Sequence, residues 1–374
     1  MNNKKTKDIT REAKEFRAPG GGSELRDKFE KESKGKLIEM LIEAYQELQR
    51  VGVENKQLKQ QVEKLMQENW ELRFDELTGL ERRLVYFTKV NSQIEQTIGQ
   101  ESVREILEGD TLSSDDLEKL KMVPLSVTSL DLGYLSKYNE DKEITQHYGG
   151  GHGGGDEMMR QTGALIQEIR PEGQEVKPKL KMETSGFRLG GDEVGMIHQL
   201  TKEEAKRVVQ EFKLKHAEIK IAGADLPPVI NDGTADFSEA VEAFVGVISK
   251  NERTEMDTEA KYKKLQEFMT NIADRRAKRA KAYERIIQMT DLFKNEPAKF
   301  ERNFSYLQKG ALRLEKEDFE ELSQLQKRDS EGFRQEVRRR INQALETEHK
   351  DKISKQIQEH QVIVKIADRE VLAS

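Results

Sequence analysis

Two separated acidic segments could hold a divalent metal ion. Apolar and polar residues alternate over 123–127, which predicts a strand that leads into Asp131. Between two later apolar runs, a pair of glycines followed by Asp192 and Glu193 predicts the turn of a β-hairpin. If these strands are neighbours, Asp131 and Asp192 could supply the carboxylate oxygens that Mg²⁺ prefers. The alternative is a solvated hairpin tip that binds nothing.

A basic pair stands further along the chain. Lys281 and Arg285 are four residues apart in a segment rich in Ala, Lys and Arg, so both lie on one face of the helix expected over 255–290. Together they could bind a phosphate group. The alternative is a solvated basic face, because further basic residues surround them at 275–279. We favour a solvated helix with a phosphate contact at one end.

Other chemical motifs are weak or absent. Six of the seven residues at 149–155 are glycine, so the spacing G-x-G-x-x-G occurs there trivially. The chain has no G-x-x-x-x-G-K-[ST] segment, so no P-loop is predicted. His147 and His152 have neither cysteine nor a third histidine close by in the sequence, so no zinc site is predicted.

Composition excludes several classes of protein. The 374 residues contain 64 Lys and Arg against 70 Asp and Glu, so no overall charge favours nucleic acid or an anionic membrane. The absence of cysteine excludes a disulfide scaffold and a cysteine nucleophile. Residues 1–16 are polar and contain no apolar segment, so we expect no secretory signal, and no run approaches the ~18 apolar residues of a membrane helix. We expect a cytoplasmic protein without membrane or nucleic-acid partners.

The order of the predicted elements is typical of an α+β or α/β sandwich, in which strands and helices alternate. Beyond the strand and hairpin above, we expect a helix at 202–216, a short strand at 219–221, a loop at 227–234, a long helix at 255–290, and a charged helical region at 291–374 with a short strand at 361–366. The helical region at 291–374 contains no chemical motif and could bind a protein partner.

The N-terminal part has a different pattern. Residues 1–36 are charged and glycine-containing, which predicts a disordered tail. Over 37–74, apolar residues recur every seven positions in two series, as in a coiled coil. The first series is Leu37, Ala44, Val51, Leu58, Leu65 and Leu72, and the second is Leu41, Leu48, Asn55, Val62 and Asn69. Asparagine in the second series favours two parallel helices and therefore a homodimer. The alternative is an amphipathic helix that lies on its own domain.

Five segments, in order along the chain, resemble the motifs of the GGDEF-domain diguanylate cyclases. They are 75–83 (D-x-L-T-G-L-x-N-R, with Arg82 for Asn), 131–139 (D-x-D-x-F-K-x-x-N), 151–156 (G-H-x-x-G-D), 188–194 (the signature hairpin, with Val194 at its end) and 273–281 (A-D-x-A-x-x-x-A-K). The resemblance covers about residues 75–290. It implies a nucleotidyl-cyclase-like palm, in which helices flank a central, mostly antiparallel sheet, preceded by the coiled-coil helix and followed by the helical tail.

The resemblance also implies roles for single residues, and Mg²⁺ or Mn²⁺ as the cofactor. The metal ligands it implies are Asp131, Asp192 and the carbonyl of Leu132, with Glu193 serving the metal or the attacking hydroxyl. The substrate-binding residues it implies are Asn139 and Asp156 for guanine, Gly190 and Gly191 for close approach of the substrate, and Lys281 and Arg285 for phosphate.

Besides Arg82 and Val194, the chain departs from the family pattern at two positions and in one segment. Gly133 replaces an acid, Ser136 replaces a phosphate-facing lysine although Lys137 follows, and residues 140–155 are a glycine-rich insertion. The leading hypothesis is a diguanylate cyclase that converts two GTP into cyclic di-GMP and pyrophosphate between two domains, which the coiled coil would hold together. The alternative is a catalytically degenerate domain that acts as a dimeric scaffold or signalling partner responding to GTP or cyclic di-GMP.

Overall fold

The computed structural model describes residues 71–109, 111–169, 184–226, 228–307, 314–347 and 355–369, and single positions between 36 and 64. The chain divides into two compact units, Met1–Trp70 and Glu71–Ser374. In the first unit every described position is helical, and Ile42, Tyr45, Val51 and Leu58 are exposed. The predicted tail, apart from Lys36, and most of both heptad series, including Asn55 and Asn69, lie outside the described residues. Dimerisation through this segment stays a prediction.

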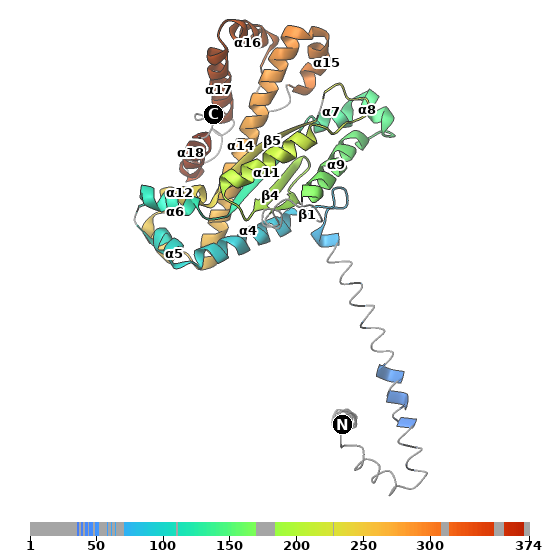
Figure 1. Ribbon diagram of the computed structural model, residues 1–374, viewed down its shortest axis with the longest axis vertical. Coiled ribbons are helices and arrows are strands. Elements are labelled where there is room, and N and C mark those ends of the chain that lie inside the picture. Colours follow the sequence, from blue (N-terminus) through green and yellow to red (C-terminus); the bar gives the residue numbers. More distant parts are fainter. Residues whose placement is uncertain are drawn as a thin grey trace. The chain divides into compact units, whose positions relative to one another are not determined.

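A five-stranded sheet forms the centre of the second unit (Figure 1). Its strand order is β1-β3-β4-β2-β5. The strands are β1 (Glu81–Arg82), β2 (Ser126–Gly133), β3 (Thr184–Arg188), β4 (Glu193–His198) and β5 (Val229–Asp236). The short β1 pairs parallel with β3, and the other three pairs are antiparallel. The predicted mostly antiparallel sheet and the hairpin of β3 and β4 are therefore confirmed.

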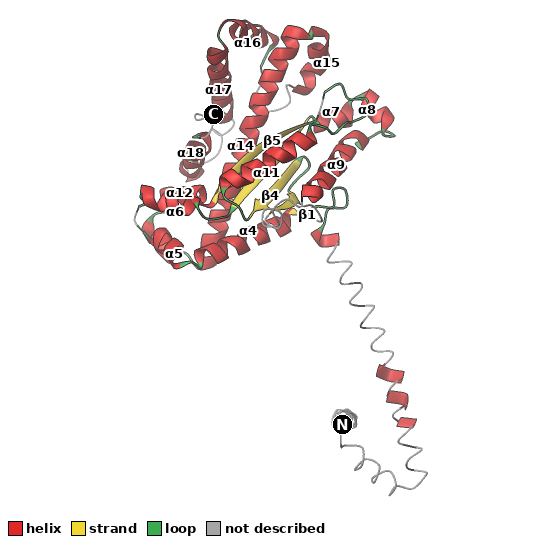
Figure 2. Cartoon of the chain, in the orientation of Figure 1, coloured by secondary structure: helices red, strands yellow, loops and turns green. Residues whose placement is uncertain are grey.

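Helices cover both faces of this sheet, with α11 on the near face and α14 on the far face in Figure 2. Before the sheet is complete the chain forms α4 (Arg83–Ile98), α5 (Glu101–Glu108), α6 (Ser114–Lys121), α7 (Leu135–Glu140), α8 (Lys142–His147), α9 (Gly153–Ile169) and α11 (Lys202–His216). After β5 it forms α12 (Phe237–Val247), α13 (Lys250–Glu255), α14 (Thr258–Asn295), α15 (Pro297–Leu307), α16 (Lys316–Arg328), α17 (Ser330–Thr347) and α18 (Lys355–Asp368).

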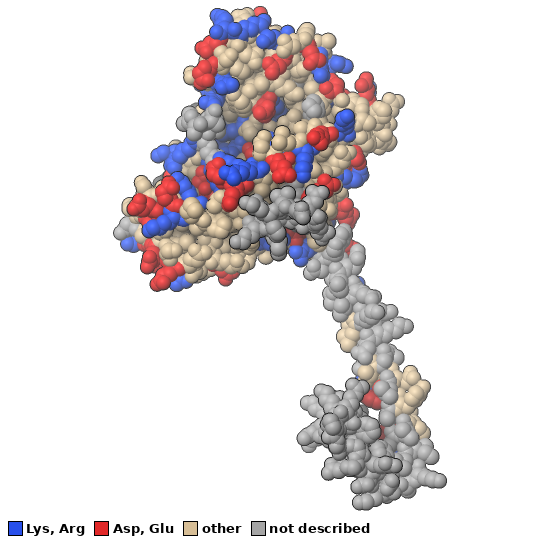
Figure 3. Space-filling view, in the orientation of Figure 1, with Lys and Arg blue, Asp and Glu red and all other residues tan. Residues whose placement is uncertain are grey.

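Alternating side chains of β2 enter two different cores, as the period of a strand requires. Leu130 packs in one core with Phe212 of α11, and Val127 packs in the other with Phe268 of α14. On the surface, the face drawn in Figure 3 carries acidic and basic side chains side by side. Among the described residues, no helix is both long and apolar enough to cross a membrane.

The long helix α14 crosses β5 at very close range. A Cβ atom on Gly233 would lie 2.1 Å from the carbonyl oxygen of Ala273 and 2.4 Å from the amide nitrogen of Ala277. Only glycine leaves room for this crossing. The helix then continues through position 290 into a C-terminal bundle, where Phe300 of α15 packs on Phe319 of α16 with ring centroids 5.6 Å apart. The boundary expected at 290 therefore falls inside one helix, and the domain boundaries stay predictions.

Most expected elements are confirmed, and three are wrong. Helices α11 and α14 occupy the predicted ranges 202–216 and, nearly, 255–290. The expected strand at 219–221 is not a strand, because hydrogen-bonded turns occupy 216–224. The expected loop at 227–234 contains most of β5, whose backbone pairs with β2 in spite of its Asn and Gly residues.

The third wrong element is the expected strand at 361–366, which lies in α18. Its β-branched residues favour a strand, but some of them also keep helical spacing. Ile363, Ile366 and Ala367 share one helical face and pack in the core formed with α12 and α14. Tertiary burial of that face decides in favour of the helix.

Candidate active site

Two of the predicted metal-binding residues converge on one lysine. Asp131 lies near the end of β2 and pairs with Glu193 of β4, and the amide of Leu132 donates a hydrogen bond of 3.1 Å to the carbonyl oxygen of Asp192. From α14, the ammonium nitrogen of Lys281 lies 2.5 Å from Asp131 Oδ1 and 3.6 Å from Asp192 Oδ2. The sheet and α14 thus bring these residues together. The predicted phosphate contacts of Lys281 and Arg285 stay predictions.

The two carboxylates have different surroundings. Asp131 is buried, with 9% of its surface exposed, whereas the side chain of Asp192 is 41% exposed. Burial raises the pKa of Asp131 above its ordinary value, the negative charge of Asp192 adds to this effect, and Lys281 and Arg285 oppose it. A positive group beside Asp131 therefore stabilises the charged form of its carboxylate.

The carboxylate oxygens of Asp131 and Asp192 fit a metal ion whose other ligands come from a bound nucleotide and water. Among the described residues, no group of three or more His, Asp and Glu side chains forms a complete ligand set. Mg²⁺ usually takes one or two carboxylates and fills its other positions with phosphate oxygens and water, which matches Asp131 and Asp192. A further oxygen is close by, because buried Asn231 stands opposite Asp131 on β5 and its Oδ1 has no hydrogen-bond partner within the described part of the chain.

The position of the missing acid is crowded. A Cβ atom on Gly133 would lie 3.3 Å from both the Cβ and the carbonyl oxygen of Val229, so a side chain there would require Val229 to shift by a few tenths of an ångström. Tyr134 follows with φ 66° and ψ 12°, a left-handed conformation that is unusual for a bulky residue. This buried turn directs the chain from β2 into α7 and was not foreseen from the sequence.

The two residues predicted to bind guanine lie at adjoining helix ends. Asn139 belongs to α7, and its Oδ1 accepts a hydrogen bond of 3.2 Å from the amide of Gly155 in the first turn of α9, next to Asp156. A Cβ atom on Gly155 would lie 2.1 Å from that oxygen. The glycine before Asp156 therefore permits the contact that brings these residues together. Their binding of guanine stays a prediction.

An ion pair fixes the hairpin turn that carries Asp192. Arg188 Nη1 donates hydrogen bonds of 2.9 and 3.0 Å to the two carboxylate oxygens of Asp75. The same guanidinium donates to the carbonyl oxygens of Gly190 and Gly191 at 3.2 and 3.4 Å. Although burial alone would raise the pKa of Asp75, its bonds with Arg188 and Thr78 hold it below the ordinary value. The motifs contain both residues, but their spacing gives no signal that they pair.

Lys137 does not replace the phosphate-facing lysine that is absent at position 136. Its side chain is buried, pairs with Asp225 and donates a hydrogen bond of 2.6 Å to Asn303 Oδ1. The ammonium group is therefore committed to the protein interior. No feature of the local sequence indicates this, because both partners are distant along the chain.

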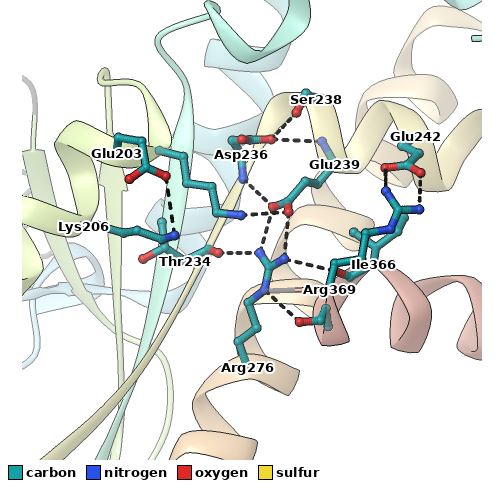
Figure 4. Close-up of polar contacts among 12 residues, drawn as sticks. Glu203, Lys206, Thr234, Asp236, Ser238, Glu239, Glu242, Arg276, Ile366 and Arg369 are labelled. Carbon is teal, nitrogen blue, oxygen red and sulfur yellow. Dashed lines mark hydrogen bonds and ion pairs between the residues drawn. The ribbon is translucent and has the colours of Figure 1, made fainter. Parts of the chain in front are cut away.

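The expectation of a solvated basic face at 275–279 is wrong for its arginines. Arg275, Arg276 and Arg279 are 6–8% exposed. Figure 4 shows Arg276 between Glu239 of α12, the carbonyl of Thr234 and the end of α18. Its guanidinium pairs with both carboxylate oxygens of Glu239 at 2.7 and 2.8 Å and donates to the carbonyls of Ile366 and Ala367. These arginines dock the C-terminal helix.

Comparison with known proteins finds remote likeness in structure alone. No family model and no curated protein matches the chain. It is similar to the coiled coil and GGDEF domain of DgcB from Caulobacter crescentus, solved with c-di-GMP, with 15% identity, 50% of this chain and 80% of that chain covered, and a TM-score of 0.35. It is also similar to diguanylate cyclase SiaD in complex with its activator SiaC from Pseudomonas aeruginosa, with 15% identity, 62% and 71% covered, and a TM-score of 0.32.

A third similar structure is the diguanylate cyclase/phosphodiesterase from Caldicellulosiruptor saccharolyticus, with 17% identity, 52% of this chain and 89% of that chain covered, and a TM-score of 0.30. By their names, all three structures are GGDEF-domain proteins or diguanylate cyclases. This is the family whose motifs the sequence resembles. The chain has a mixed five-stranded sheet flanked by helices, as expected from that resemblance.

Proposed function

We propose that this chain condenses two GTP molecules into cyclic di-GMP with release of pyrophosphate. The observation that supports the proposal is the convergence of Asp131 and Asp192 on one positive charge, that of Lys281, where β2 meets the hairpin. A triphosphate bound with Mg²⁺ is usually held by one or two carboxylates at the metal and by cations at the phosphates. The carboxylates stand where β2 meets the hairpin, and α14 supplies the cations beside them.

In the proposed reaction, the 3′-hydroxyl oxygen of each GTP bonds to the α-phosphorus of the other. At each α-phosphorus the bond to pyrophosphate breaks, so that two phosphodiester bonds form and two pyrophosphates leave. Asp131, Asp192 and the carbonyl of Leu132 would hold Mg²⁺ or Mn²⁺, which neutralises charge on the triphosphate. Lys281 and Arg285 would bind its phosphate oxygens. Glu193, opposite Asp131 on β4, would assist the metal or receive the hydroxyl proton.

Guanine would be bound at the other end of the substrate. Asn139 and Asp156 would offer an amide and a carboxylate to the edge of the base, held together by the contact of Asn139 with Gly155. Gly190 and Gly191 would let the substrate approach the hairpin backbone. Because each domain would bind one GTP, two chains must face each other, and the predicted coiled coil would raise their effective concentration.

The test is incubation of the purified full chain with GTP and Mg²⁺, followed by mass analysis of the products. We expect one cyclic dinucleotide for every two pyrophosphates released. The isosteric variant Asp192→Asn should retain its unfolding temperature and lose at least about 99% of the activity, as removal of a metal carboxylate should cost several kcal/mol in the transition state. Absence of any dinucleotide from the wild-type chain would refute the proposed activity.

A second function is a catalytically degenerate, dimeric scaffold or signalling partner. Its support is Gly133 in place of an acid and Ser136 in place of a lysine, because Lys137 is committed to Asp225 and Asn303 and cannot take the place of that lysine. In that case GTP or cyclic di-GMP would bind without turnover, and the C-terminal helices would be available to a protein partner. Equilibrium binding of GTP without product formation would favour this function.

A further inference from the structure

A buried polar cluster joins the helix that carries Asn139 to the C-terminal bundle. Its members are Lys137 of α7, Asp225 of the segment between α11 and β5, and Asn303 of α15, and we call it the α7–α15 clamp. Lys137 pairs with Asp225 and donates a hydrogen bond of 2.6 Å to Asn303 Oδ1. Asn303 Nδ2 lies 3.3 Å from Asp225 Oδ2, so each member contacts the other two.

Burial and hydrogen bonds hold the side chains of the α7–α15 clamp in place. Lys137 and Asn303 are each 1% exposed, and Asn303 Nδ2 also donates to the carbonyl of Lys299 at 2.8 Å. Both ends of the Asn303 amide are therefore bonded, which fixes its orientation. A buried ammonium is costly unless it is paired and hydrogen-bonded, and Asp225 and Asn303 meet that requirement.

The clamp acts on a very short helix. Helix α7 comprises six residues, and Lys137 precedes Asn139 by two positions. Between these two residues, Tyr138 donates a hydrogen bond of 3.1 Å from its hydroxyl to the carbonyl oxygen of Leu226. One turn and a half of helix has little stability of its own. Its position therefore depends on these contacts with the 225–226 segment and with α15.

We propose that the α7–α15 clamp makes the C-terminal bundle a determinant of guanine selection, because it positions Asn139. This inference rests on the proposed function, in which Asn139 binds the base. Lys137, Asp225 and Asn303 are positioning residues that do not touch the nucleotide. Loosening the clamp should reduce affinity for a guanine nucleotide more than for an adenine nucleotide, because phosphate and metal contacts come from β2, the hairpin and α14.

The test uses the full chain with Asn303→Ala, which keeps the pair of Lys137 with Asp225. The matched control is Glu301→Gln on the same helix, which removes an exposed pair with Lys316; among the described residues, Glu301 forms no hydrogen bond or ion pair with α7. The probes are 3′-deoxy-GTP and 3′-deoxy-ATP with Mg²⁺, since neither has the hydroxyl that would react. Hydrogen exchange of residues 135–140 reports on α7 without any nucleotide.

We expect Asn303→Ala to speed exchange in α7 and to weaken binding of 3′-deoxy-GTP about tenfold, the effect of one well-placed hydrogen bond, with 3′-deoxy-ATP changed less than about twofold. Glu301→Gln should change neither. Equal weakening of both nucleotides, or unchanged selectivity with faster exchange, would overturn the inference and leave a purely structural role.

Two further outcomes are distinct. If the wild-type chain binds both 3′-deoxy nucleotides equally, the proposed guanine site is refuted. If hydrogen exchange in α7 of Asn303→Ala is unchanged, the α7–α15 clamp itself is refuted.

A second variant is used if Asn303→Ala does not fold. It is Asp225→Asn, because the side chain of Asp225 is 30% exposed and lies outside the bundle. The same loss of guanine selectivity is expected from that variant.

Discussion

The ammonium of Lys281 lies 2.5 Å from the carboxylate of Asp131, although 150 positions separate the two residues in the sequence. Their side chains are 19% and 12% exposed, so the pair is largely shielded from water. A carboxylate in this position needs a cation, whether the lysine or a metal supplies it. The pair therefore matters to folding as well as to the proposed chemistry.

The first prediction is that Lys281→Met lowers the free energy of unfolding by about 2 kcal/mol, because Asp131 is left without its nearest positive charge. Adding Asp131→Asn should restore about half of the loss, since no charge then remains to be neutralised. Urea unfolding of the two single variants and the double variant measures the coupling. Lys278→Met, which removes an exposed pair with Asp274, should cost less than about 0.5 kcal/mol. Strictly additive losses would contradict the pairing.

The second prediction concerns the crossing of α14 and β5. Gly233→Ala should cost about 2–3 kcal/mol, because the new Cβ would overlap the backbone of Ala273 and Ala277 and force the helix away from the sheet. Gly191→Ala is the control for stability, as nothing lies within 4 Å of a Cβ there. Thermal unfolding of both variants checks the difference. Equal unfolding temperatures would show that the helix does not cross this closely.

The third prediction is that Arg276→Met destabilises the fold by about 3–5 kcal/mol, because it leaves the buried carboxylate of Glu239 without its main partner. Burial alone would raise the pKa of Glu239, but Arg276 and Lys202 lower this pKa to about 2. The variant should also release α18, which hydrogen exchange over 355–369 would report. Arg369→Met, whose side chain is 51% exposed, should cost at most about 1 kcal/mol. A variant with unchanged exchange in α18 would contradict the docking role.

The fourth prediction concerns pH. His198 is fully buried, with one ring nitrogen 3.0 Å from the hydroxyl of Thr128 and the other 3.0 Å from that of Thr184. Burial lowers its pKa from 6.5 to about 3 in the folded chain. Between these values the unfolded chain binds more protons, so the free energy of unfolding should fall as the pH falls from 6.5 to 3. His216, with a pKa lowered to about 4, should act in the same direction.

Urea unfolding at several pH values measures this decline, which we expect to approach about 1.4 kcal/mol per pH unit for each histidine near the middle of the window. Resonances of the His198 ring in the folded protein should not titrate above pH 5. Protonation of that ring near pH 6.5 in the folded chain would contradict the prediction.

Elements with a strong local pattern were predictable from the sequence. The hairpin of β3 and β4 has two apolar runs and a Gly-Gly turn, and α11 has an uninterrupted helical pattern with a capping box at Thr201 and Glu204. The five motifs also led to Asp131 and Asp192, which the structure places at the same lysine. In these cases local preference and tertiary packing agree.

The rest depends on partners that no local pattern reveals. Strand β5 contains Asn231 and Gly233, which are typical of loops, but Gly233 is required by the crossing of α14. Arg276 and its neighbours have the composition of a solvated helix, but Arg276 is buried against Glu239 and the carbonyls of Ile366 and Ala367, all of which are distant in the sequence. Lys137 looked available for phosphate because Asp225 and Asn303 are distant in the sequence.

The burial of these arginines has a practical consequence for recombinant fragments. A truncation at residue 290, where the family resemblance stops, would remove α18 and strip Arg275 and Arg279 of Asp368. It would also take Asn303 away from Lys137. Such a fragment would expose interior cations to solvent, so loss of activity in it would report damage to the truncated protein rather than the properties of its nucleotide site. Fragments that extend through residue 369 avoid this artefact.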